Sequence, residues 1–157
     1  MSEMKQVKAA DLFKLVDELF EMDSRVWITV TGTSMYPFLK GSRDSVELSK
    51  IAFESLKRGD IVLIKRDSGD YVLHRVLKKK KDCFYIIGDA QQWVEGPLMP
   101  AQLLAVVTKL KRKKRTFDCS SPLVKTAVWI WLMLIPFRYM IFKLGRLLLR
   151  LIRKLKG

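Results

Sequence analysis

The chain has 157 residues, which is enough for one hydrophobic core with an appendage and excludes two full-size domains. Lys and Arg total 30 against 16 Asp and Glu, a formal net charge of +14, so we expect an anionic partner, either nucleic acid or an anionic membrane surface. Two cysteines and a single histidine exclude a disulfide framework and a structural zinc site, and we expect no cofactor.

The first elements predicted in chain order are helical. In AADLFKLVDELF the apolar residues share one helical stripe, which predicts an N-terminal amphipathic helix within residues 1–25. The charged residues between them exclude a membrane span, and we expect no secretory signal here.

After residue 25 the sequence changes to short β-rich runs separated by turn signals. We expect residues 26–116 to form one compact, mainly antiparallel β unit. RDSGD at 66–70 predicts a hairpin turn between two of its strands. The predicted strands are VWITV, SVELS, IVLIK, YVLHRVL, CFYIIG and LLAVVTKL.

A constrained serine lies in VTGTSMYPFLKG, residues 30–41. Gly32 permits a turn that bulkier residues resist, and Pro37 restricts the backbone of Tyr36. Ser34 is therefore held in a fixed backbone, which suits a nucleophile, although a serine in a turn more often only bonds to its own turn.

A histidine and two carboxylates accompany Ser34 in the β unit. His74 is the only histidine and lies within YVLHRVL, where a packed or surface role is the ordinary alternative to catalysis. The segment GDAQQWVEGPL supplies Asp89 directly after a strand and Glu95 six residues later. A serine, an imidazole and a carboxylate are the parts of a nucleophile, its general base and the group that orients the base.

Four motifs follow one another between Thr31 and Leu98: GTSMYPFLKG, KRGDIVLIK, HRV and GDAQQWVEGPL. Together they resemble the sequence boxes of type I signal peptidases, membrane-bound serine endopeptidases that cleave signal peptides from exported proteins. HRV resembles the box with the general base, which is Lys in the usual bacterial branch and His in the endoplasmic-reticulum, archaeal and sporulation-type branch. The resemblance implies a signal-peptidase/LexA-like β fold.

The resemblance also implies roles for individual residues. Ser34 matches the nucleophile, His74 the general base, and Asp89 the carboxylate of the last box. Glu95 stands where the His branch usually has Asp, and the glutamines at 91–92 replace an Asn pair, so either Asp89 or Glu95 orients His74. With a carboxylate partner, we expect the pKa of His74 to lie at roughly 6 to 7.

Further roles follow from the same chemistry. The backbone N–H of Ser34 is the expected oxyanion donor, with a second donor from Thr31 or Thr33. Lys65 or Lys78 is the alternative base if activity requires a higher pH. The resemblance implies substrates with small residues before the cleaved bond, bound in an extended conformation along a strand edge.

Residues 117–157 form a hydrophobic and basic segment. Its longest uncharged run, 126–137, would rise about 18 Å as a helix against a hydrocarbon core of about 30 Å. A span would require either Lys125, or Arg138 and Lys143, to snorkel, and Pro136 would kink the helix. The following FKLGRLLLRLIRKLKG predicts a basic helix in an anionic membrane interface, with packing against the β unit as the alternative.

These features predict a membrane-associated serine endopeptidase of the signal-peptidase type that cleaves signal or leader peptides. Basic flanks on both sides of the apolar run favour an in-plane or re-entrant anchor at the plasma membrane, with the β unit on the cytoplasmic face. Expected partners are a peptide or preprotein substrate and anionic lipid, and no specific nucleic acid is expected. The sequence leaves open whether an accessory membrane subunit also binds. The alternatives are a non-catalytic membrane-surface or nucleic-acid-binding module on the same scaffold, and a self-cleaving repressor-like protein, disfavoured because no helix-turn-helix is found.

Overall fold

The computed structural model describes residues 25–155 of the chain. The amphipathic helix expected from AADLFKLVDELF falls outside the described residues, so that prediction stays a prediction. Within the described residues the protein is mainly β, as the sequence predicted, and two α-helices follow the strands.

Eight strands pair antiparallel in one sheet. They are β1 (Val26–Thr29), β2 (Asp44–Ser49), β3 (Ile61–Lys65), β4 (Tyr71–Lys79), β5 (Phe84–Ile87), β6 (Val94–Leu98), β7 (Leu103–Arg112) and β8 (Arg115–Asp118). The order across the sheet is β1-β2-β7-β3-β4-β5-β6, and β8 also pairs with β7.

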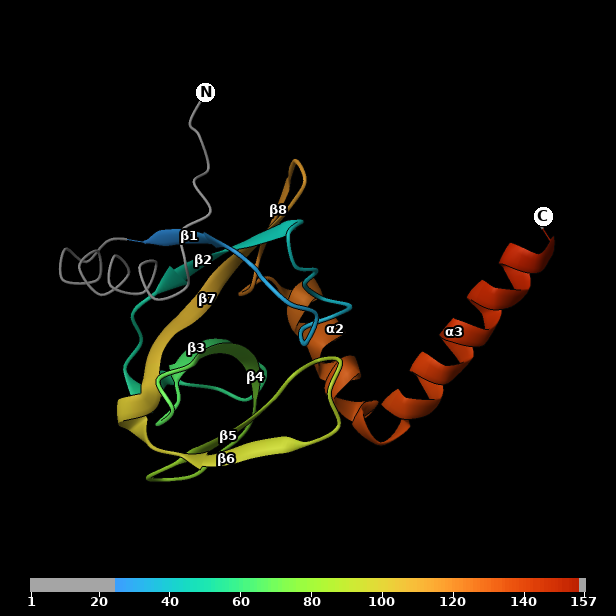
Figure 1. Ribbon diagram of the computed structural model, residues 1–157. Coiled ribbons are helices and arrows are strands. Elements are labelled where there is room, and N and C mark those ends of the chain that lie inside the picture. The colour runs from blue at the N-terminus through green and yellow to red at the C-terminus, as the bar shows by residue number, and fades with distance from the viewer. Residues whose placement is uncertain (1–24, 156–157) are drawn as a thin grey trace.

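The longest strand, β7, joins the two halves of the sheet. Its first half pairs with β3, where Leu63 lies opposite Ala105, and its second half pairs with β2, where Val46 lies opposite Leu110. Figure 1 shows β7 running from the end that holds β1 and β2 to the end that holds β3 to β6. One continuous strand therefore sets the positions of both halves.

Two hydrophobic cores fill the faces of the sheet. The run IVLI in β3 is buried throughout because successive side chains enter different cores. Ile61 and Leu63 lie in one core, which also receives Met35 from the serine-containing loop, and Val62 and Ile64 lie in the other. Both cores are built from the apolar runs that predicted the strands.

The turn at RDSGD is confirmed, since Arg66 N–H donates to the carbonyl of Asp70 at 2.8 Å between β3 and β4. The sequence did not predict β6 and β8. β6 contains Gly96 and Pro97, residues usually found in turns, and a proline is tolerated there because β6 is an edge strand. All four residues of β8 are exposed, so no apolar pattern marked it.

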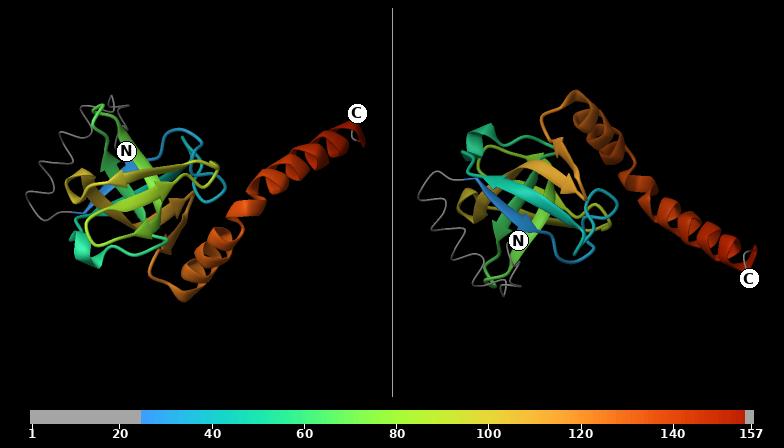
Figure 2. Two further views of the ribbon diagram at one scale, coloured as in Figure 1. Left: turned by 90° about the horizontal axis from the view of Figure 1, so that it is seen from below. Right: turned by 90° about the horizontal axis from the view of Figure 1, so that it is seen from above.

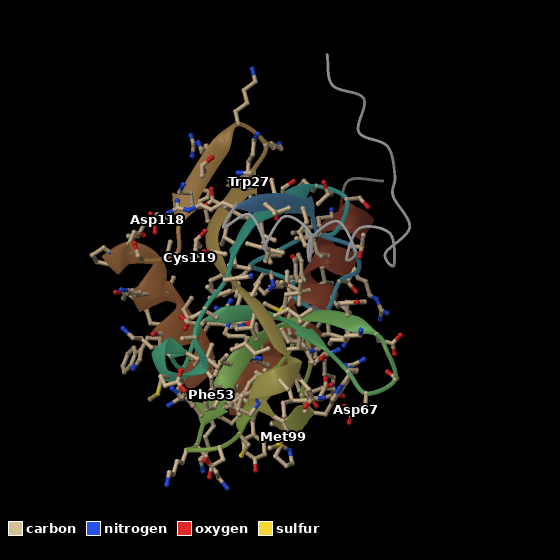
Figure 3. All side chains as sticks on the ribbon, turned by 90° about the vertical axis from the view of Figure 1, so that its left-hand side faces the viewer. Trp27, Phe53, Asp67, Met99, Asp118 and Cys119 are labelled. Atoms are coloured by element: carbon tan, nitrogen blue, oxygen red, sulfur yellow. The ribbon has the colours of Figure 1, made fainter. Side chains whose placement is uncertain are left out.

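The C-terminal segment forms α2 (Pro122–Met133) and α3 (Arg138–Leu155). Asp118 and Cys119, labelled in Figure 3, lie where β8 leads toward α2. The hydroxyl of Ser121 caps α2 by accepting from Val124 N–H at 3.4 Å. The described residues also contain three short 3-10 helices, η1 (Phe53–Ser55), η2 (Pro100–Gln102) and η3 (Ile135–Phe137).

Pro136 lies in η3, between the two helices, where the sequence predicted a kink. Among the described residues no single helix has the length and apolar character to cross a membrane; α2 and the segment Ile135–Ile152 meet both criteria only as a pair, bent by 58°. Figures 1 and 2 show α2 beside the sheet and α3 projecting away from it.

Candidate active site

Ser34 lies on a loop that is closed at its base and packed at its tip. Residues 30 and 44 are joined by a hydrogen bond of 2.9 Å, and Gly41 N–H donates to the Gly32 carbonyl at 3.1 Å. A side chain on Gly41 would overlap the Gly32 backbone, so this close approach requires glycine. Met35 and Leu39 anchor the tip because both are buried in the core. The loop therefore holds Ser34, which is half-buried, in one position.

The backbone of Ser34 rests on the turn that follows β5. Its carbonyl accepts a hydrogen bond of 2.8 Å from Ala90 N–H. A Cβ on Gly88 would lie 2.8 Å from the same carbonyl oxygen, so a larger residue at this position would push the serine loop away. The Gly-Asp that follows a strand in the sequence is thus a contact surface for the Ser34 loop.

This turn lies beside His74. In the pairing of β4 with β5, Arg75 is opposite Ile87, so the next pair in the same register is His74 with Gly88. Ser34 and His74, forty residues apart in the sequence, therefore both lie next to the turn that begins at Gly88. No hydrogen bond joins their side chains in the described part of the chain, as is common for catalytic groups without substrate.

His74 is buried, with 3 % of its surface exposed. Its Nδ1 atom is buried and has no hydrogen-bond partner. Burial lowers the pKa of His74 to about 4, with the Glu95 charge opposing the shift. The pKa of roughly 6 to 7 expected from the sequence differs because the strand pairing that buries the imidazole was not visible there. The imidazole is neutral, and so able to act as a base, throughout the neutral range.

Glu95, from β6, is the carboxylate beside this imidazole, with Oε2 3.8 Å from Nδ1 of His74. Arg66 binds both of its oxygens, through Nε at 2.5 Å and Nη2 at 2.6 Å. This pairing lowers the pKa of Glu95 and raises that of Arg66. Glu95 is therefore an anion held just beyond hydrogen-bond distance of the histidine.

Asp89 occupies a different position. Consecutive residues of a strand point to opposite faces, so Arg75 lies on the other side of β4 from the neighbouring histidine. Arg75 binds both oxygens of Asp89, at 2.8 and 2.6 Å, and both side chains are almost completely buried. It also donates to the Gly59 carbonyl and lies 4.8 Å over the ring of Phe38. The Arg75–Asp89 pair thus joins the turn after β5, the serine loop and the residues just before β3.

Arg138, the first residue of α3, is fully buried against the same turn. It donates to the Gly88 carbonyl at 3.2 Å and lies 3.9 Å from Asp89. In a membrane span this arginine would have to snorkel; in the structure its side chain is buried in the protein. Sequence reasoning missed its contact with the site because a lone arginine in an apolar run carries no signal of its partner.

The other residues considered as donors or bases can also be placed. Ser34 N–H donates to no other backbone group within the described residues, while Thr31 and Thr33 are exposed. Lys65 and Lys78, the alternative bases, are exposed, unlike His74. Among residues 25–155 no group of three or more His, Cys, Asp and Glu side chains is arranged to hold a metal ion.

Comparison of the chain with models of known protein families, and with curated proteins, gives no match. The described residues place a loop-held serine against the turn after β5, a buried neutral imidazole on the neighbouring strand β4, and an anionic carboxylate 3.8 Å from that imidazole. Such a set can deprotonate a hydroxyl and stabilise the imidazolium that forms.

Proposed function

We propose that the protein is a serine endopeptidase of the signal-peptidase type, with Ser34 as nucleophile, His74 as general base and Glu95 as the group that orients His74. The observation that carries the proposal is the environment of the imidazole. Its Nδ1 is buried without a partner, and the nearest carboxylate oxygen lies 3.8 Å away. Leaving a buried N–H without a hydrogen-bond acceptor costs free energy. A small movement of Glu95 toward His74 would let Oε2 accept a hydrogen bond from Nδ1–H.

The reaction would proceed as follows. With the proton on Nδ1 facing Glu95, Nε2 of His74 accepts the proton of Ser34 as its hydroxyl oxygen attacks the peptide carbonyl. The free N–H of Ser34 stabilises the oxyanion. The imidazolium then gives its proton to the leaving amine as the C–N bond breaks, and water hydrolyses the acyl-enzyme by the reverse proton route.

In this proposal Asp89 has a structural role. Both of its oxygens are bound by Arg75, on the opposite side of β4 from the base. The last box of the signal-peptidase resemblance therefore supplies two carboxylates with separate tasks. Asp89 holds the turn against the serine loop, and Glu95 serves the histidine.

The proposal extends to the fold and the location of the protein. The antiparallel sheet with a serine loop and a histidine strand supports a signal-peptidase/LexA-like arrangement. The exposed apolar residues of α2 and α3, together with basic residues on α3, support association with anionic lipid at the plasma membrane, with the β unit on the cytoplasmic face. The substrates would be signal or leader peptides with small residues before the cleaved bond.

A serine-directed covalent probe, applied in detergent and read by intact mass, tests the proposal. We expect one adduct on the wild-type protein, none on Ser34→Ala, and much slower labelling of His74→Ala. Ser55→Ala, which removes an exposed hydroxyl on η1, is the matched control and should label like wild type. Equal labelling of Ser34→Ala and wild type would reject the catalytic proposal and favour the non-catalytic membrane-surface module.

A further inference from the structure

Most of α3 is uncovered by the rest of the described chain. The helix has 18 residues and projects from the body of the protein (Figures 1 and 2). Most of a helix's stability in proteins comes from tertiary packing of its apolar face, which the exposed part of α3 lacks within the described residues. Its exposed side chains include both apolar and basic residues: Leu144, Leu147, Leu148, Leu151, Ile152, Lys143, Arg146 and Arg150. Aliphatic residues interleaved with cations match an anionic bilayer surface, which we take as the occupant of this face.

Two side chains near the start of α3, Arg138 and Phe142, are packed against the rest of the protein. Arg138 is fully buried and lies 4.9 Å over the ring of Trp131, whose carbonyl it also contacts. One turn later, Phe142 lies 6.4 Å from the ring of Tyr36 in the serine loop. The helix that projects to solvent is therefore rooted directly on the candidate active site.

Neutralising Asp89 does not explain the burial of Arg138. Arg75 already binds both Asp89 oxygens, and the closest approach of Arg138 to this carboxylate is 3.9 Å. The Nε atom of Arg138 is buried without a partner, and burial lowers the pKa of its guanidinium. A buried cation with incomplete hydrogen bonding costs free energy, so its docked position is held weakly and can be reversed.

A short path connects this arginine to the nucleophile. Arg138 donates to the Gly88 carbonyl, and two residues later Ala90 N–H donates to the Ser34 carbonyl at 2.8 Å. Anything that keeps α3 folded from its first residue also keeps Arg138 against this turn. Binding of the exposed part of α3 to lipid would do so, because the membrane supplies the packing that the helix lacks in water.

We propose that Arg138 is a positioning residue through which binding of α3 to an anionic bilayer stabilises the turn 88–90 against Ser34. The peptidase site is then completed at the membrane surface. This inference rests on the proposed function for its effect on catalysis, but the stabilisation of the turn can be measured without any activity.

Amide hydrogen exchange at Ala90 is the direct measurement. We expect anionic vesicles of phosphatidylcholine with about 30 % phosphatidylserine to slow this exchange several-fold in the full-length wild type. Arg138→Gln should exchange faster without vesicles and gain little from them. Arg115→Gln is the matched control, since it removes the same charge from an exposed position of β8, outside the lipid-binding face, and its exchange at Ala90 should be slowed by vesicles as in wild type. Equal slowing in Arg138→Gln and wild type would overturn the proposal.

Peptidase assays complete the test. We expect vesicles to raise kcat by about tenfold or more in wild type and Arg115→Gln, with KM little changed, and to leave kcat of Arg138→Gln near its vesicle-free value. Arg138→Met, which keeps the length of the side chain and removes the buried charge, should fold and also lose the lipid effect. If vesicles slow the exchange at Ala90 but no cleavage depends on Ser34, only the proposed peptidase function is rejected. If cleavage depends on Ser34 but vesicles change neither kcat nor the exchange at Ala90, only the proposed coupling between lipid binding and the site is rejected.

Discussion

Two arginine–carboxylate pairs lie on opposite faces of β4, and their environments differ. Arg75 and Asp89 are almost completely buried, with 1 % and 0 % of their side-chain surfaces exposed, whereas Arg66 and Glu95 expose 36 % and 22 %. The buried pair ties together the turn after β5, the serine loop and the entrance to β3. The more exposed pair lies beside the histidine, with Glu95 3.8 Å from its Nδ1.

The difference shows how one short segment can carry two functions. GDAQQWVEGPL contains both carboxylates, and the resemblance to a known box drew attention first to Asp89. The burial and full pairing of Asp89 indicate a structural role, while the incomplete contact between Glu95 and His74 leaves room for a change during catalysis.

Asp89→Ala leaves the Arg75 guanidinium buried without its partner. We expect the free energy of unfolding to fall by about 3–5 kcal/mol, because an uncompensated buried charge is strongly destabilising. Urea denaturation followed by circular dichroism measures the change, with Glu95→Gln as the control from the other pair. A loss below about 1 kcal/mol would contradict a structural role for Asp89.

Glu95→Gln should show the opposite result. We expect kcat/KM to fall about a hundredfold or more while the melting temperature stays close to that of wild type, since Gln cannot stabilise the imidazolium of His74. Glu95→Asp keeps the charge and should retain more activity. Steady-state kinetics on a peptide substrate tests this, and an unchanged rate for Glu95→Gln would remove Glu95 from the mechanism.

The burial of His74 predicts a pH dependence of stability. The folded pKa of about 4 lies below the unfolded value of about 6.5, so the unfolded state binds the proton first as the pH falls. Stability due to the neutral imidazole is therefore complete above about pH 6.5 and is lost progressively toward pH 4, at a cost of about 2 kcal/mol between pH 7 and 5. Unfolding curves of wild type and His74→Gln across this range measure it. The same slope in both proteins would show that another group titrates.

Arg66→Ala should have the smallest effect on stability, about 1 kcal/mol or less, because the pair is partly exposed. Arg66 lowers the pKa of His74 and holds Glu95 at 3.8 Å, so its removal should raise the His74 pKa from about 4. We expect the acidic limb of the kcat/KM profile to move to higher pH by about one unit. Arg66→Lys keeps the charge and should move it less. If the acidic limb of the kcat/KM profile did not move in Arg66→Ala, the Arg66–Glu95 pair would have no influence on the pKa of His74.

The sequence by itself determined which segments form the β unit. All six predicted apolar runs contain strands. A continuous apolar run such as IVLIK fits a strand that is buried on both faces, because its successive side chains enter two different cores. The break at Pro136 was also local information, because a proline disrupts a helix whatever surrounds it. The edge strands β6 and β8 were missed because edges need little apolar surface.

Only the tertiary structure decided how the candidate site is arranged. Strand register aligned His74 with Gly88, and alternation along β4 sent His74 and Arg75 to opposite faces. The sequence left Asp89 and Glu95 as equal candidates because a carboxylate's partner depends on residues up to 29 positions away, such as Arg66. The burial of Arg138, fifty residues from Gly88, was likewise invisible. Local propensities depend on neighbours in the chain, whereas pairing, burial and pKa depend on neighbours in space.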